Sequence, residues 1–147
     1  VFDGLERDWR KRMFIQGNLS KQETLNKHKA RVDGGDESVL FGLASFAEGV
    51  DLPGDYCEHV VIAKIPFAVP DDPVEAALAE WIEARGGNPF MEIAVPDASL
   101  RLIQACGRLL RTEKDRGIIT LLDRRVVTQR YGKAILNALP PFRREIS

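Results

Sequence analysis

Three continuous apolar stretches, separated by segments with helical periodicity, constrain the fold of this chain most strongly. They cover residues 38–44, 59–65 and 117–122, and turn residues bound them. Strands without a polar side are typical of parallel sheets that helices cover on both faces. The alternation of such strands with helices therefore predicts an α/β fold with a mostly parallel sheet.

The helices are predicted from cap residues and from apolar spacing. Ser20, followed three residues later by Glu23, forms a capping-box pattern that opens a helix ending before Gly34. Asp72-Pro73 opens another helix in the same way. The remaining predicted elements are a strand over residues 13–16 and helices over residues 2–11, 72–85, 97–112 and 128–138.

Length and composition indicate a single globular domain. The chain has 147 residues, of which 44% are hydrophobic and 29% charged, and this excludes the disordered, collagen-like and coiled-coil classes. Its longest apolar stretch, residues 39–47, is about half of the roughly 20 residues that span a bilayer, so no membrane partner is expected. The chain begins with Val1 instead of methionine, which suggests a piece of a longer protein.

Titratable and thiol side chains outside the main motifs suggest no metal chemistry. Cys57 and Cys106 stand too far apart for a disulfide framework or a zinc or iron-sulfur pattern, and we expect both to be small buried thiols in a reducing cytosol. His28 is expected on an exposed helix face and His59 at the start of a strand.

The net charge of −1 hides a strong segregation of charge along the chain. Residues 1–32 carry eight Lys/Arg and four Asp/Glu, residues 33–100 carry two and fourteen, and residues 101–147 carry eleven and four. This pattern suggests a basic face from both ends of the chain, suited to phosphates or nucleic acid, beside an acidic flank. Ordinary solvated helix faces that happen to segregate are the alternative.

The loop after the strand at 38–44 is a candidate binding segment, because ligands of such sheets bind beyond the carboxyl ends of the strands. Gly49 can present its backbone amide to a phosphate, and Asp51 can accept hydrogen bonds from ribose hydroxyls. A purely structural turn at Pro53-Gly54 that Asp51 caps is the alternative.

The predicted helix at 97–112 carries its long polar side chains on one narrow stripe. At about 100° per residue, the apolar residues from Leu100 to Leu110 fill one half of the helix surface. The opposite stripe holds Arg101, Gln104, Arg108 and Arg111. Like charges at these spacings weaken a helix, whereas planar guanidinium groups suit phosphate oxygens. The stripe therefore favours an anion site, with a plain exposed basic face as the alternative.

These segments resemble helicase motifs. Residues 104–111, QACGRLLR, resemble motif VI of superfamily 2 helicases, with the pattern Q-x-x-G-R-x-x-R. Residues 45–54, SFAEGVDLPG, resemble motif V of the XPD and DinG branch, and the flanks at 64–73 and 123–133 fit the same branch. The resemblance runs from about residue 38 to residue 142. The chain is therefore similar to the C-terminal motor domain of bacterial DinG-type ATP-dependent DNA helicases.

The resemblance implies a fold and a domain assignment. We expect a RecA-like sheet of the P-loop NTPase type with helices on both faces, truncated at its N-terminal edge. Residues 1–147 would then be the second motor domain of a longer protein. No phosphate-binding loop of pattern G-x-x-x-x-G-K-[ST] occurs, so ATP and Mg²⁺ would be held mainly by an absent N-terminal motor domain. An iron-sulfur cluster, where present, would also lie outside this chain.

The resemblance also implies roles for individual residues. Arg108 and Arg111 would act as arginine fingers on the γ-phosphate, with Gln104 beside them. Asp51 would hold the nucleotide, and Glu48 belongs to the same ATP-side pattern. The residues expected near DNA are Ser45, Gly49, Arg101 and Lys64.

The implied activity is ATP-driven unwinding of DNA in repair or replication in the bacterial cytoplasm. The expected partners are single-stranded DNA and the N-terminal motor domain, and the isolated chain is expected not to hydrolyse ATP. Two alternatives stay open: a nucleic-acid-binding module that kept the fold and lost catalysis, and an ATP-driven translocase or remodeller that acts on RNA.

Overall fold

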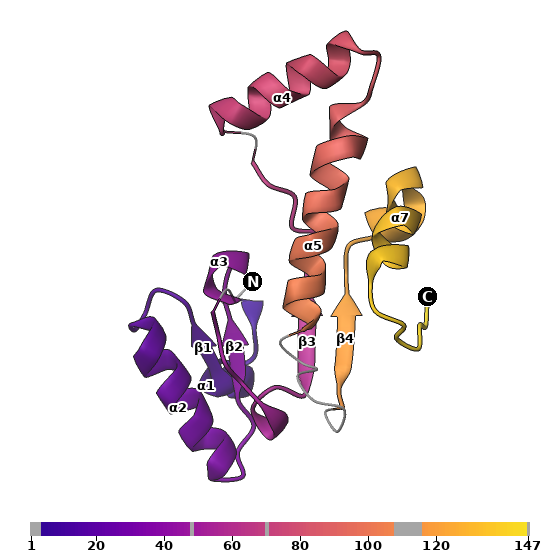
Figure 1. The fold of residues 1–147 in the computed structure, drawn as a ribbon. Helices are drawn as coiled ribbons and strands as arrows, with labels where there is room; N and C mark the ends of the chain where they lie inside the picture. Colours follow the sequence, from indigo (N-terminus) through magenta and orange to yellow (C-terminus); the bar gives the residue numbers. More distant parts are fainter. Residues whose placement is uncertain (1–3, 48, 70, 108–115, 147) are drawn as a thin grey trace. The chain divides into compact units, whose positions relative to one another are not determined.

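The computed structural model describes residues 4–47, 49–69, 71–107 and 116–146 (Figure 1). The chain forms two compact units, which are considered one at a time. Unit 1 comprises Val1–Glu58 and Arg108–Gly117, and unit 2 comprises His59–Gly107 and Ile118–Ser147.

Unit 1 contains a parallel strand pair with a long helix as its crossover. Its elements are α1 (Arg7–Arg12), β1 (Met13–Ile15), α2 (Lys21–Asp33), β2 (Val39–Phe41), α3 (Ala44–Ala47) and the 3-10 turn η2 (Gly54–Tyr56). Met13 pairs with Val39 and Ile15 with Phe41. Parallel neighbours need such a crossover connection, and α2 supplies it. On α1, the Arg12 guanidinium lies 5.6 Å from the centre of the Trp9 ring.

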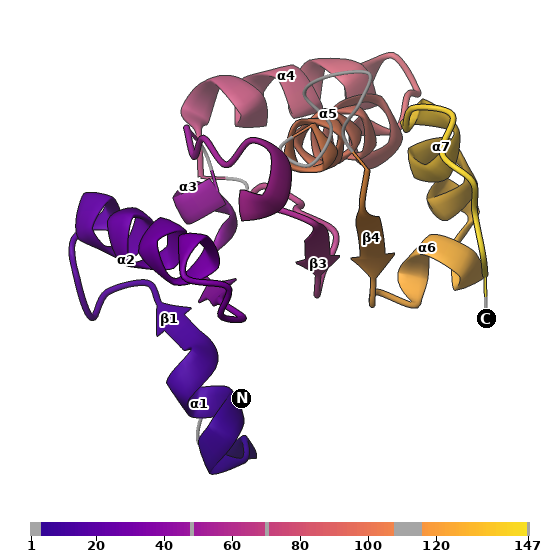
Figure 2. The ribbon, with the colours of Figure 1, turned by 90° about the horizontal axis from the view of Figure 1, so that it is seen from below.

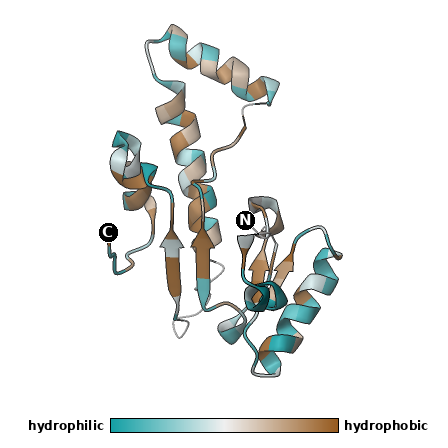
Figure 3. Cartoon of the chain, turned by 180° about the vertical axis from the view of Figure 1, so that it is seen from behind, coloured by the Kyte–Doolittle hydropathy of each residue, from teal (hydrophilic) through white to brown (hydrophobic). Residues whose placement is uncertain are grey.

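The predicted capping box opens α2. The Ser20 hydroxyl accepts a hydrogen bond from the Glu23 amide at 3.3 Å, and the Glu23 carboxylate accepts one from the Ser20 amide at 3.2 Å. The hydrogen bonds from Ser20 lower the pKa of Glu23. Most of α2 is hydrophilic (Figure 3). Its buried side consists of Thr24, Leu25 and His28, which share one helix face.

Unit 2 contains the second parallel strand pair. Its elements are β3 (His59–Ile62), α4 (Pro73–Ala84), the π-helical turn η3 (Phe90–Ala94), α5 (Val95–Cys106), β4 (Ile118–Leu121), α6 (Arg125–Thr128) and α7 (Arg130–Ala138). His59 pairs with Ile118 and Ile62 with Leu121. The predicted α/β class with parallel strands is confirmed, and the strands form two separate pairs.

The core of unit 2 forms where α5, α6 and α7 pack beside the strands (Figures 1 and 2). Ala98 and Ile135 are completely buried, and Leu102 and Cys106 are 1% exposed. Gly132 in α7 permits the closest approach: an added Cβ would lie 2.0 Å from the Val126 carbonyl oxygen. The helices of this unit are therefore held together by a tightly packed apolar seam.

The β3–β4 pair is covered on one face only within the described part of unit 2. Ile62 and Leu121 pack against the core, whereas Val61 is 54% and Ile118 63% exposed on the other face. A continuous apolar run predicts that both faces will be covered, but it does not reveal which elements cover them. The exposed face also carries His59 and Thr120, which are hydrogen-bonded at 2.9 Å, so it is a mixed surface.

Candidate functional site

The motif V loop, residues 45–54 of unit 1, contains both buried and exposed side chains. Phe46, Val50 and Leu52 are buried, at 8%, 5% and 8% exposure. Ser45 and Asp51 are exposed. The loop therefore turns its polar members outward while its apolar members fix its path.

The apolar members of the motif V loop belong to the core of unit 1. Phe46, Val50 and Leu52 form one buried cluster with Leu25 of α2. Gly42 allows this packing, because a Cβ at that position would lie 2.9 Å from the Cβ of Phe46. Burial of three such side chains contributes roughly 1.5–3 kcal/mol each, so the loop is well anchored.

Gly49 takes a backbone conformation that suits its predicted role. Its φ is +69°, in the left-handed region that glycine adopts without a steric penalty. The space around its Cα is open, since an added Cβ would meet no atom within 4 Å. The backbone is accessible here to a large ligand. Glu48, the neighbouring predicted site residue, lies outside the described residues.

The turn that follows the motif V loop is tied to α2. The predicted turn at Pro53-Gly54 is present as η2, and Gly54 has a φ of +58°. Tyr56 at its end donates a hydrogen bond from its hydroxyl to Asp33 at 2.7 Å. This bond raises the pKa of Tyr56.

His28 was predicted on an exposed helix face, and the structure shows that this was wrong. The side chain is 5% exposed and makes two hydrogen bonds of 2.8 Å, one to the Ser38 hydroxyl and one to the Tyr56 carbonyl. Helical periodicity did not predict this burial, because the buried face of α2 has Leu25 as its only apolar member beside Thr24 and His28. His59 begins β3 as predicted.

The motif VI helix is α5, in unit 2. Gln104 and Arg101 are exposed on it, on the side away from the buried Leu102 and Cys106, as the predicted stripe requires. Arg101 forms an ion pair with Asp97 one turn earlier, with 2.8 Å between Nε and Oδ2. Arg108 and Arg111, the predicted arginine fingers, lie outside the described residues.

The described helix differs from the prediction in its bounds and in two residues of its apolar half. It begins at Val95 instead of Asp97, since the π-helical turn η3 leads directly into it, and it ends at Cys106, with Gly107 as its C-cap, instead of near residue 112. Leu100 is 54% exposed, because it lies at the boundary between the two faces, and Gly107 is exposed as well. Of the predicted polar stripe, Arg101 and Gln104 lie within α5.

Lys64 is exposed just beyond β3, and the residue after it, Ile65, is bound to the buried carboxylate of Asp123. Asp123 accepts a hydrogen bond from the Ile65 amide at 2.9 Å and binds the Arg125 guanidinium through both carboxylate oxygens at 2.6–3.1 Å. The Arg125 side chain, followed by backbone amides, holds the pKa of Asp123 far below its ordinary value. Asp123 thereby joins the ends of β3 and β4, a role that its sequence position alone did not reveal.

An aromatic cluster lies beside the Arg125 guanidinium. The rings of Phe67, Phe90 and Tyr131 have centroids 5.1–5.6 Å apart, and Arg125 lies 5.6 Å from the Phe67 ring centre. Such packing holds the chain after Lys64 against η3 and α7.

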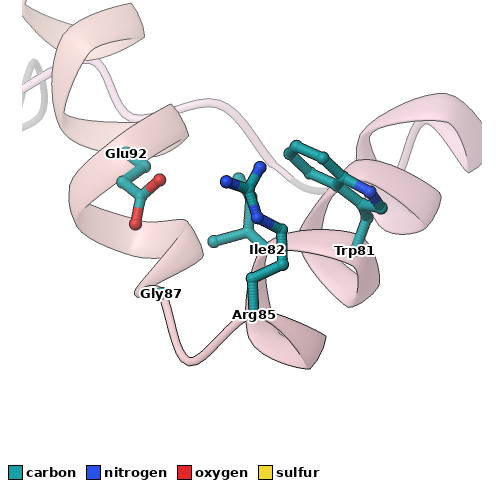
Figure 4. A pocket seen from close by; sticks show the side chains of 5 residues that line it. All are labelled: Trp81, Ile82, Arg85, Gly87 and Glu92. Carbon is teal, nitrogen blue, oxygen red and sulfur yellow. The ribbon is translucent and has the colours of Figure 1, made fainter.

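A small hollow of about 180 Å³ lies between the end of α4 and η3 (Figure 4). It is lined by Trp81, Ile82, Arg85, Gly87 and Glu92. The Arg85 guanidinium stacks 4.3 Å from the Trp81 ring centre. None of the predicted site residues lines this hollow.

The described parts of the chain contain no group of three or more His, Cys, Asp or Glu side chains that could hold a metal ion. Cys106 is buried as predicted, which raises its pKa, whereas Cys57 is only half-buried. Over the same residues, no helix has both the length and the apolar character needed to cross a membrane.

Comparison with known proteins identifies the family. A profile of the helicase C-terminal domain matches residues 2–142. The chain belongs to this family. The predicted resemblance to DinG-type helicases is confirmed, as is the membership of motifs V and VI in a helicase motor domain.

Several relatives carry the name ATP-dependent DNA helicase DinG. The protein of Photobacterium profundum is 56% identical over 134 residues, which cover 91% of this chain and 19% of that protein. The proteins of Salmonella choleraesuis and Escherichia coli are each 42% identical over 135 residues, which cover 92% of this chain and 19% of each protein. The chain thus spans about a fifth of the length of these relatives.

The predicted site residues that the structure describes fall into two sets. Ser45, Gly49 and Asp51 share the motif V loop of unit 1. Gln104, Arg101 and Lys64 belong to unit 2, on α5 and beyond β3.

Proposed function

We propose that this chain is the second motor domain of a longer ATP-dependent DNA helicase and acts in the bacterial cytoplasm on single-stranded DNA. The observation that carries the proposal is the motif V loop, whose apolar residues are buried while Ser45, Gly49 and Asp51 are presented. The family match and the names of the relatives support it.

On the nucleotide side, Asp51 accepts hydrogen bonds from the ribose or its neighbours, and Gly49 offers its backbone amide. Arg108 and Arg111 stabilise the charge that develops on the γ-phosphate, with Gln104 beside them. Phosphoryl transfer depends on such stabilisation, and an arginine supplied across an interface contributes about 10³- to 10⁵-fold in rate. ATP and Mg²⁺ are bound mainly by the first motor domain, outside this chain.

On the DNA side, Ser45 and the Gly49 backbone contact the phosphate backbone, and Lys64 and Arg101 add positive charge. The ion pair of Arg101 with Asp97 is compatible with this role. Both side chains are partly exposed, at 42% and 34%. Exposed pairs of this kind contribute about 0–1 kcal/mol, so a phosphate can replace the carboxylate at little cost.

The two roles couple hydrolysis to movement. Two motor domains that share one ATP close when it binds and separate after hydrolysis. A strand gripped alternately by each domain is then drawn along. An iron-sulfur cluster, if the intact protein has one, belongs to another part of the protein.

The test is the DNA-stimulated ATPase rate of the intact protein. We expect Arg108→Ala and Arg111→Ala to lower this rate about 10³-fold, while Arg130→Ala on the exposed side of α7 leaves it within twofold. The isolated 147-residue chain should hydrolyse no ATP. Full activity in both finger variants would refute the assignment.

Strand displacement on forked substrates separates the alternatives. Unwinding of DNA but not RNA supports the proposal. Unwinding of RNA alone indicates a remodeller, and DNA binding without hydrolysis by the intact protein indicates a module that has lost catalysis.

A further inference from the structure

The most heavily bonded buried polar group of unit 1 outside the predicted site is the imidazole of His28. Its Nε2 faces the Tyr56 carbonyl oxygen at 2.8 Å, and its Nδ1 faces the Ser38 hydroxyl at the same distance. A carbonyl can only accept, so Nε2 carries a proton and donates it. In the neutral ring, Nδ1 then accepts from the Ser38 hydroxyl.

The two partners of His28 lie on either side of the motif V loop in the sequence. Ser38 directly precedes β2, from which the chain enters the motif V loop, and Tyr56 ends η2, where the chain leaves it. One side chain on α2 therefore joins the entry and the exit of residues 39–56.

The backbone at Tyr56, where the chain leaves the loop, depends on His28 more than the backbone at Ser38 does. At the entry, β2 is already hydrogen-bonded to β1. At the exit, η2 is a single turn, and its contacts with α2 include His28, the Asp33 bond to the Tyr56 hydroxyl, and Lys29 at 5.4 Å from the Tyr56 ring centre. The loop between these ends contains Gly49 and Gly54, both at positive φ, a conformation that glycine adopts without a steric penalty.

We propose that His28 is a positioning residue for the motif V loop, acting through the Tyr56 carbonyl to fix where Asp51 and the Gly49 backbone are presented. The inference rests on the proposed function, because the loop must meet a nucleotide for its position to matter. A displacement of about 1 Å in a positioning group can lower a reaction rate by up to 10²-fold.

Two substitutions separate the two hydrogen bonds of His28. The amide nitrogen of glutamine reaches nearly as far as Nε2, so His28→Gln keeps the donor to the Tyr56 carbonyl and loses the acceptor for Ser38. Asparagine is shorter and reaches only the position of Nδ1, so His28→Asn keeps the Ser38 bond and loses the Tyr56 bond. Ser38→Ala removes the entry bond alone and is the matched control.

The first measurement is amide hydrogen exchange over residues 49–57 in the intact protein. We expect exchange in His28→Asn to be about tenfold faster than in the wild type, and that in His28→Gln and Ser38→Ala to stay within about twofold. If His28→Asn does not fold, His28→Gln decides instead, because exchange about tenfold faster than wild type in this variant, which keeps the donor to the Tyr56 carbonyl, would overturn the proposal. Tyr56→Phe removes only the bond to Asp33 and is a further control. Equal exchange in all variants and the wild type would overturn the proposal.

The second measurement is the DNA-stimulated ATPase rate per folded molecule. His28→Asn should lower kcat about tenfold, and the loss should vanish in an Asp51→Ala background, because both substitutions then act on the same contact. Equal losses in His28→Gln and His28→Asn, independent of Asp51, would show a merely structural role. If the wild-type protein itself hydrolyses no ATP, the proposed function fails, and amide exchange alone decides the role of His28.

Discussion

At the scale of single residues, Asp123 is a buried carboxylate whose charge is stabilised by its hydrogen-bond partners. It is 8% exposed and holds both the Ile65 amide and the Arg125 guanidinium. A carboxylate with such partners is stabilised in its charged form, which lowers its pKa. Its ionisation is therefore linked to folding.

This linkage predicts a pH-dependent contribution to stability. Because the folded pKa of Asp123 lies below the unfolded value of about 3.9, the contribution is fully present above about pH 5 and is lost as the pH falls further. Asp123→Asn should lower the free energy of unfolding of the chain by about 1–3 kcal/mol at pH 7, and the difference from wild type should shrink toward pH 3. Urea unfolding at several pH values measures both effects.

Arg125→Ala is the partner variant for this prediction. It removes the main cause of the lowered pKa, so it should flatten the same pH dependence. A difference between Asp123→Asn and wild type that stays constant from pH 7 to pH 3 would contradict the assignment.

At the scale of elements, cap residues predicted where helices begin, whereas apolar spacing alone did not: the helix predicted over residues 2–11 is α1, Arg7–Arg12. Ser20 and Asp72 cap α2 and α4 as their patterns indicate. The strands are shorter than the apolar runs, which continue into the neighbouring loops. Ile65 beyond β3 is buried, at 4% exposure, whereas Leu43 beyond β2 is 73% and Leu122 beyond β4 60% exposed. Strand pairing depends on a neighbouring strand that hydropathy does not identify, so the runs located the strands without fixing their ends.

The cap of α2 gives a prediction at this scale. Ser20→Ala removes the hydroxyl that accepts from the Glu23 amide and should lower the free energy of unfolding by about 1 kcal/mol. Ser20→Asp keeps an acceptor and should cost only a few tenths of a kcal/mol. Chemical denaturation of both variants compares them, and equal losses would show that the cap does not matter.

At the scale of the whole molecule, the motifs predicted the family and the exposed residues of the motif V loop. They did not predict the hydrogen bonds that hold the surrounding segments together. Ser45, Gly49 and Asp51 could be named because the chemistry of phosphates and ribose restricts residue types. The bonds of His28 and Asp123 join residues 28 and 58 positions apart in sequence, and no local pattern encodes them. The roles of Arg108 and Arg111 remain predictions.

Binding of single-stranded DNA gives a prediction for the intact protein. Its affinity should fall linearly with the logarithm of salt concentration, because each neutralised phosphate releases counterions. Lys64→Ala and Arg101→Ala should each reduce the slope by about 0.7, whereas Lys27→Ala on α2 should not change it. Fluorescence anisotropy with an oligonucleotide at several salt concentrations measures the slopes, and unchanged slopes would remove both residues from the DNA side.

The stacked arginine and tryptophan at the hollow beside α4 also have a practical consequence. The sequence has two tryptophans, Trp9 in unit 1 and Trp81 in unit 2, and each lies near an arginine that its helix supplies. Replacing either indole by phenylalanine leaves a single tryptophan, in one unit, which can be excited selectively over Tyr56 and Tyr131. Emission from the two variants can therefore follow the melting of each unit independently, without an attached dye.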